Sequence, residues 1–151
     1  MSVEDNIKKL NIEIPNAPDP VGNYLPFVKS GNLIFISGQL PIDTNGKIIE
    51  GKIGFDLDVK SAEIATKIAT LNVLGQLKKA LGNLNLIKKC IKITGYYNCA
   101  KDFKDHPKIL NTASNLIVEL LGEKGKHTRV VVGVNSLPLN AAVEIETIFE
   151  I

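Results

Sequence analysis

The last quarter of the chain reads GKHTRVVVGV at residues 125–134, then LP at 137–138 and AVEIETIF at 142–149. Its two β-branched runs, Val130–Val134 and Val143–Phe149, have the composition of strands that are buried on both faces. A charged side chain is costly inside such a strand unless it is paired. Yet the first run follows Arg129 and the second contains Glu144. Either these charges belong to structural ion pairs, or they border a pocket that needs a cation and a carboxylate.

The rest of the chain predicts helices and further strands around these two runs. Apolar residues at three- and four-residue spacing predict helices over Ser61–Leu81 and His106–Leu121. The predicted stripes are Ile64, Ile68, Leu71, Leu74, Leu77 and Leu81 in the first helix, and Ile109, Ala113, Leu116, Ile117 and Leu120 in the second. Leu33–Ser37 and Lys89–Tyr97 read as strands, and Asn45-Gly46 is the strongest hairpin signal. The order of these elements predicts an α+β fold with the two main helices on one face of a mixed sheet.

Length and composition exclude several classes of protein. A chain of 151 residues is long enough for one domain, so we expect a single domain over 1–151, in which 1–15 form an N-terminal helical extension opened by Ser2 and Asp5. No apolar run approaches the roughly 18 residues of a membrane span, and the N-terminus lacks a secretory signal, which predicts a cytoplasmic protein. The net charge is +2, and the basic and acidic residues are well mixed along the chain, so the sequence shows no basic patch of the kind that binds nucleic acid. A zinc site needs about four ligands at characteristic spacing, and this chain has only His106 and His127 to add to its two cysteines, so no metal is expected.

The candidate site residues are polar and include no convincing nucleophile: Tyr24, Ser37, Asn111, Arg129 and Glu144. Arg129 offers a planar fork that matches a carboxylate. Glu144 has apolar neighbours that raise a carboxyl pKa, and it is suited to orient or deprotonate a water. The other three side chains donate hydrogen bonds to ligand oxygens or position that water. Together they suit the binding of a small carboxylate and the addition of water to it, although each residue taken alone also has a structural explanation.

Three segments resemble the YjgF/RidA family of reactive-intermediate deaminases, from about residue 16 to residue 151. They are GNY at 22–24, GNLIFISGQ at 31–39, and the spacing from Arg129 through Leu137-Pro138 to Val143-Glu144-Ile145. The resemblance implies a chorismate-mutase-like fold and a homotrimer with clefts between subunits. It also implies cofactor-free hydrolysis of enamine or imine acids, such as 2-aminoacrylate, to 2-oxo acids and ammonia. Some members of the family are described instead as ribonucleases or translation inhibitors.

Carried over onto this chain, the family pattern makes Arg129 the residue that grips the substrate carboxylate and Glu144 the one near the reacting water. Tyr24, Ser37 and Asn111 match the polar lining. The chain departs from the archetype at Val131, where a cysteine is usual, and at Asn23, where a proline is usual. It therefore resembles a divergent branch. A trimeric protein that binds small carboxylates without turnover, in a regulatory role, is the alternative, and a ribonuclease is a weaker one.

Overall fold

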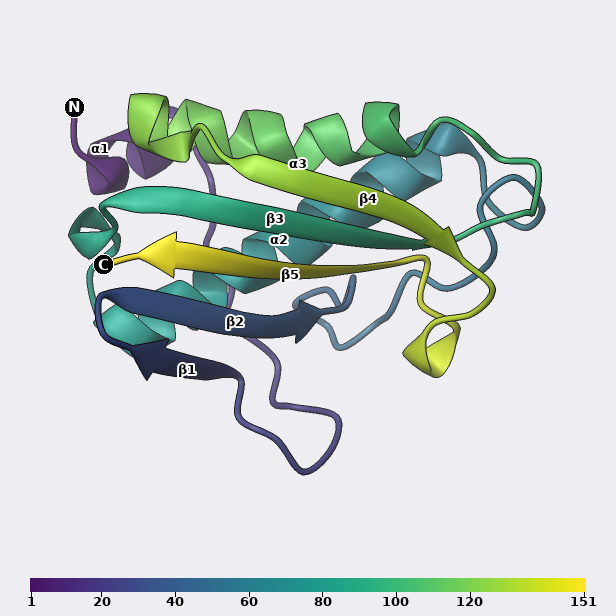
Figure 1. Ribbon diagram of the computed structural model, residues 1–151, viewed down its shortest axis with the longest axis horizontal. Helices are drawn as coiled ribbons and strands as arrows, with labels where there is room; N and C mark the ends of the chain where they lie inside the picture. The colour runs from purple at the N-terminus through teal and green to yellow at the C-terminus, as the bar shows by residue number, and fades with distance from the viewer.

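The computed structural model describes residues 1–151 and consists of one mixed β-sheet with helices on one face (Figure 1). The strands are β1 (Phe27–Ser30), β2 (Leu33–Gln39), β3 (Lys89–Asn98), β4 (Thr128–Val134) and β5 (Val143–Glu150). They lie in the order β1-β2-β5-β3-β4. All neighbouring strands are antiparallel except β3 and β4, which are parallel. This arrangement confirms the predicted α+β class with a mixed sheet.

Two long helices cover the same face of the sheet, as predicted. The helices are α1 (Val3–Lys9), α2 (Val59–Leu81) and α3 (His106–Leu121), with short 3-10 turns η1 (Leu84–Leu86), η2 (Gly122–Gly125) and η3 (Pro138–Asn140). The bounds of α3 agree with the prediction. Helix α2 begins two residues before the predicted start at Ser61. The reason is that the Asp58 carboxylate caps the helix, accepting from the backbone N–H of Ser61 at 2.8 Å. None of the helices combines the length and hydrophobicity needed to cross a membrane.

The predicted apolar stripe of α2 is wrong in the N-terminal half of the helix. The structure buries Ala62, Ala65 and Ala69 there and leaves Ile64 49% exposed. Small side chains allow α2 to lie close to the sheet, and this close packing outweighs the larger apolar area of isoleucine. The stripe of α3 is confirmed, since all five of its predicted members are buried.

The prediction that the two C-terminal runs are buried on both faces is also wrong. Val130 and Val132 of the edge strand β4 are 44% and 41% exposed, and only alternate residues of β5 are buried. The physical reason is that no element of this chain covers the second face of the sheet, which faces the viewer in Figure 1. Phe35 of β2 is exposed on the same uncovered face.

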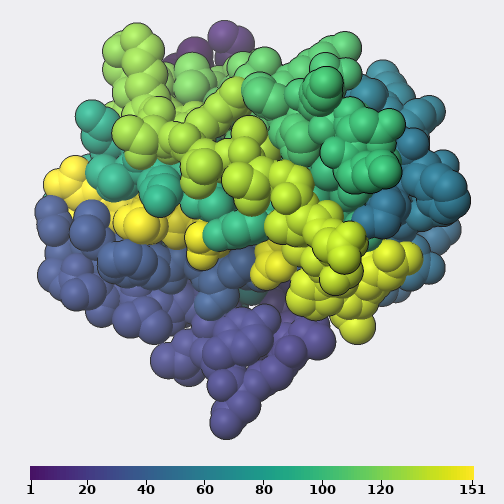
Figure 2. All heavy atoms as spheres, turned by 45° about the vertical axis from the view of Figure 1, so that its right-hand side comes forward, coloured from purple at the N-terminus to yellow at the C-terminus, as the bar shows by residue number.

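The N-terminal segment wraps the helix side of the molecule. The predicted capping box is present, since Ser2 and Asp5 bond reciprocally at the start of α1. Val3 and Ile7 of α1 join the same core cluster as the sheet, although the predicted limits of the domain and of its extension stay predictions. Residues 11–26 then run without helix or strand to β1, and part of this segment forms the purple-blue lobe at the bottom of Figure 2.

The Asn45-Gly46 turn does not join two strands of the sheet, although it is the strongest hairpin signal in the sequence. It closes only a single bridge between Ile42 and Ile48. The hairpin that belongs to the sheet joins β1 to β2 through Gly31, whose φ of +59° is the left-handed conformation that glycine adopts readily.

Candidate functional site

The first half of the candidate site lies at the β4 edge of the sheet, beside α3. Arg129 of β4 is half-buried, and its Nη1 donates to the Ser114 hydroxyl at 3.1 Å while its Nη2 donates to the Pro107 carbonyl at 3.3 Å. The chain has two ion pairs and neither includes Arg129, so no carboxylate lies within 4.0 Å of its guanidinium. Only two of its five N–H donors are therefore used, and three are left for a ligand.

A line of hydrogen bonds fixes the position of Ser114. His127 Nδ1 lies 2.6 Å from the Gly125 carbonyl, which only accepts, so this nitrogen carries a proton and Nε2 is the acceptor of the neutral tautomer. His127 Nε2 then accepts from the Ser114 hydroxyl at 3.0 Å. The hydroxyl in turn accepts from Arg129. His127 and Ser114 thus orient the guanidinium, a role that the sequence did not reveal for Ser114.

Asn111 lies on the same side of α3 as the contacts of Arg129. It is four residues after Pro107 and three before Ser114, the spacings that place helical residues on one face. Its side chain is exposed and makes no hydrogen bond within the chain. Asn111 therefore lies on the side of α3 that Arg129 contacts, and that the two residues hold one ligand stays a prediction.

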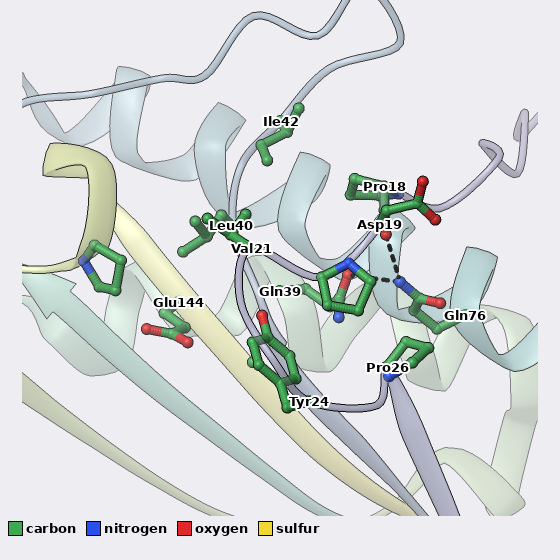
Figure 3. A pocket seen from close by; sticks show the side chains of 13 residues that line it. Pro18, Asp19, Val21, Tyr24, Pro26, Gln39, Leu40, Ile42, Gln76 and Glu144 are labelled. Atoms are coloured by element: carbon green, nitrogen blue, oxygen red, sulfur yellow. Dashed lines mark hydrogen bonds between the residues drawn. The ribbon is translucent and has the colours of Figure 1, made fainter.

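The second half of the candidate site is a pocket of about 200 Å³ near the opposite edge of the sheet (Figure 3). Glu144 of β5 and Tyr24 of the proline-rich loop both line it. Two buried amides, Gln39 and Gln76, form part of the wall, and Gln76 Nε2 holds the loop by donating to the Pro18 carbonyl at 3.0 Å. The pocket has no Lys, Arg or His in its lining, so it contains the carboxylate but not the cation of the predicted site.

Glu144 holds its proton more tightly than an ordinary surface carboxyl group does. Burial raises the pKa of Glu144 above its usual value of 4.5, and the charge of Glu146, two residues along the same strand, raises it further. Gly38 on β2 makes room for this side chain, because a Cβ at position 38 would overlap the Glu144 carboxylate. The glycine of the ISGQ segment is therefore a steric requirement of the site.

Ser37 lies outside the lining of the pocket. Its hydroxyl donates to the Leu25 carbonyl at 2.6 Å and so fastens the loop that carries Tyr24. Ser37 thus positions the tyrosine rather than facing the cavity. No group of three or more His, Cys, Asp or Glu side chains is arranged to hold a metal ion.

The two halves of the site face opposite sides of the sheet. Residues paired across neighbouring strands point to the same face, and Arg129 pairs with Ile93, which pairs with Thr147 on the helix side. Glu144 pairs with Tyr96, which pairs with Val132 on the uncovered side. One copy of the chain therefore cannot close Arg129 and Glu144 around a small molecule.

Comparison with known proteins assigns the family. Residues 4–151 match the family model described as YjgF/chorismate_mutase-like, putative endoribonuclease. The chain belongs to the YjgF family. The predicted recognition is thereby confirmed, and the mixed α+β sheet with its helices is the YjgF/chorismate-mutase-like fold.

The most similar proteins cover nearly the whole chain. Protein TCP17 of Trypanosoma cruzi is 36% identical over 150 residues, which are 99% of this chain and 94% of that protein. The crystal structure of Atu1372, a protein of unknown function from Agrobacterium tumefaciens, is 44% identical with a TM-score of 0.90, covering 99% of this chain and 92% of the other. The crystal structure of a protein from Shewanella oneidensis, described as a putative endoribonuclease, is 33% identical with a TM-score of 0.95 and full coverage of both chains.

Family members whose names state an imine deaminase activity or a bound amino acid are more distant. A 2-iminobutanoate/2-iminopropanoate deaminase of Dermatophagoides farinae is 27% identical, covering 91% of this chain and 92% of that protein. Escherichia coli TdcF, solved with bound serine, is 26% identical with a TM-score of 0.65, covering 93% and 97%. The drop in TM-score from 0.95 to 0.65 agrees with a divergent branch of the family.

Proposed function

We propose that the protein hydrolyses reactive imino or enamine acids of the 2-aminoacrylate type to 2-oxo acids and ammonia, in clefts between the subunits of a homotrimer. The observation that carries the proposal is the division of the site. Arg129 is an unpaired cation that points to one face of the sheet, and Glu144 is a carboxylate that points to the other and lines a pocket. A second copy that sets its Glu144 pocket against the Arg129 edge of the first would complete the site.

The uncovered face of the sheet supports assembly. Phe35, Val130 and Val132 expose apolar side chains there, and apolar surface on an uncovered sheet face suits contact with another copy of the chain. Three copies in cyclic symmetry would give three identical clefts. Both cysteines are free thiols, which fits the proposed cytoplasmic location.

The chemistry follows from the two halves. The free N–H donors of Arg129 bind the substrate carboxylate, and Asn111 beside it donates to the same group. Glu144 of the neighbouring subunit takes a proton from a water, whose oxygen attacks the imine carbon, and passes that proton to the imine nitrogen. The resulting carbinolamine loses ammonia and leaves the 2-oxo acid. Burial raises the pKa of Glu144, which makes its carboxylate a stronger base toward the proton of the water.

Binding without turnover is the second candidate function. The bound serine of TdcF supports an amino-acid-sized ligand, and Val131 replaces the cysteine of the archetype beside Arg129. We expect no intrinsic RNA cleavage, although the family description includes endoribonuclease, because a net charge of +2 offers little counterion release.

Two measurements on one preparation separate the candidates. Calorimetry with 2-oxo acids tests acid binding, and an assay of imine hydrolysis, with the imine generated in situ by an amino-acid oxidase, tests turnover. Deaminase activity that is lost in both Arg129→Ala and Glu144→Gln supports the enzyme. Acid binding without turnover of any imine supports the binding protein, and absence of both rejects the site.

A further inference from the structure

A second hollow, of about 470 Å³, lies where β3 ends, α3 begins and β4 ends. Its lining includes Lys52, Lys101 and His106 but no Asp or Glu. It also includes Cys99, one of the two free thiols of the chain. None of these residues takes part in the function proposed above, and the inference that follows does not depend on it.

Cys99 and His106 form a pair in the wall of this hollow. The Cys99 Sγ lies 3.4 Å from Nε2 of His106, within hydrogen-bonding distance for sulfur. The Phe103 ring packs edge-on against the imidazole at 5.1 Å between centroids, which holds the ring in place. The pair also depends on Gly133 of β4, because a Cβ there would lie 2.6 Å from both the sulfur and Nε2. Any other residue at position 133 would push the two groups apart.

A fixed positive charge lies beside the thiol. Lys52 Nζ donates to three oxygens, the Asn98 side chain at 2.9 Å and the carbonyls of Cys99 at 3.4 Å and Asn135 at 2.7 Å, and it has no carboxylate partner. Burial raises the pKa of the Cys99 thiol, and the Lys52 charge acts against that rise. The thiol is therefore protonated at rest, and His106 is placed to accept its proton as an attacking thiolate forms. Cys99 is only 8% exposed, but it lines the hollow beside this positive charge, and an electropositive surrounding is one feature of reactive cysteines.

We propose that Cys99 and His106 form a thiol-exchange site for small anionic disulfides. His106 Nε2 takes the proton of Cys99, and the thiolate attacks one sulfur of the disulfide. A mixed disulfide forms on Cys99 as the S–S bond of the small molecule breaks, and the departing thiolate takes the proton from His106. Cys99 is oxidised and the leaving half of the disulfide is reduced, so no other oxidant is needed. A small thiol reverses the step.

Cys90 provides a matched control within the same chain. It is fully buried among the helix-facing residues of β3, and burial raises its pKa to about 12. A cysteine in such surroundings is inert. Modification of the folded protein should therefore occur at Cys99 and not at Cys90.

The experiment compares two aliphatic disulfides of opposite charge, oxidised glutathione and cystamine, on the folded protein. The rate of mixed-disulfide formation at each cysteine is measured by mass spectrometry. Each rate is divided by the rate of the same reagent with the urea-unfolded chain. This normalised rate removes the difference in intrinsic reactivity between the two disulfides. We expect one adduct per chain, at Cys99, in wild type and Cys90→Ala, and none in Cys99→Ala. The normalised rate should be on the order of 10-fold higher for glutathione than for cystamine, and Lys52→Met should reduce that ratio.

Two variants test the role of His106. His106→Gln removes the base, and Gly133→Ala keeps both groups but separates them. Each should slow exchange at Cys99 by about 10-fold or more, and circular dichroism confirms that the variant is folded. Equal normalised rates for the two disulfides, adducts at Cys90 as fast as at Cys99, or wild-type rates in folded His106→Gln would each overturn the proposal. If one variant does not fold, the other decides the role of the base.

Discussion

Arg129 and Glu144 point to opposite faces of one sheet, three register positions apart, with β3 between their strands. Two strand spacings of about 4.8 Å and three residues of about 3.3 Å separate their backbones by roughly 14 Å. Side-chain rotation cannot bring the two groups to one small ligand, because the sheet itself lies between them. The proposed function therefore requires that two copies of the chain share the site.

We expect wild type to have a solution mass of about 49 kDa, three times the 16.4 kDa of one chain. Val132→Glu places a charge on the uncovered face and should yield a monomer, because an unpaired buried charge is costly at an interface. Ile64→Glu, at an equally exposed position on the helix side, should leave the mass unchanged. Light scattering measures all three. A wild-type mass near 16.4 kDa would reject both the trimer and the shared cleft.

Mixed trimers test the shared site directly. Arg129→Ala and Glu144→Gln should each be inactive alone. Refolded together in equal amounts, they should recover about one quarter of wild-type activity, because that share of clefts receives an intact Arg129 from one subunit and an intact Glu144 from its neighbour. No recovery after verified mixing would place the two residues in separate functions.

Arg129→Lys should bind 2-oxo acids almost as poorly as Arg129→Ala, because lysine keeps the charge but lacks the two-pronged fork. Loss of such a contact costs about 2–5 kcal/mol, or roughly 30-fold to several-thousand-fold in affinity. Ser114→Ala should weaken binding by a smaller factor, since it removes only the hydrogen bond that orients the guanidinium. Titration calorimetry measures all of these affinities. Wild-type affinity in Arg129→Lys would show that the arginine is structural.

The pH dependence of kcat/KM should report Glu144. As a general base it works when ionised, so activity should fall as the pH drops through its raised pKa, which lies above 4.5. Glu146→Gln removes the neighbouring negative charge, lowers the pKa of Glu144 and should move this acid limb to lower pH. Glu144→Gln should remove the limb and slow turnover by about 10²–10⁴ while acid binding survives. If the acid limb of the kcat/KM profile stays at the same pH in Glu146→Gln, the limb reports the titration of a group other than Glu144.

Gly38→Ala should destabilise the fold by about 1–3 kcal/mol and abolish turnover, because the added methyl group overlaps the Glu144 carboxylate. Urea unfolding measures the loss. Adding Glu144→Ala to Gly38→Ala should restore part of the stability by freeing that space, a coupling expected only between residues in contact. Additive effects of the two changes would contradict the close approach of β2 and β5 at this point.

Local sequence patterns determined the elements that depend on neighbouring residues along the chain. The 3.6-residue period of Ile109 to Leu120 predicted the buried stripe of α3, Gly122 predicted its end, and Ser2 and Asp5 predicted the start of α1. The spacing of Arg129, Leu137-Pro138 and Glu144 pointed to the family, and comparison confirmed it. These signals survive without tertiary structure because residues a few positions apart already specify helix faces and caps.

Tertiary structure alone decided which faces are buried and which side chains meet. A run such as Val130–Val134 is apolar at nearly every position, so its composition cannot tell which side a second layer covers. Strand order and register, set by contacts between distant segments, placed Arg129 and Glu144 on opposite faces. The same long-range packing left Ile64 exposed and brought Cys99 to His106 across Gly133. Such pairings depend on how whole elements pack against one another, and the periodicity of a single segment carries no information about that packing.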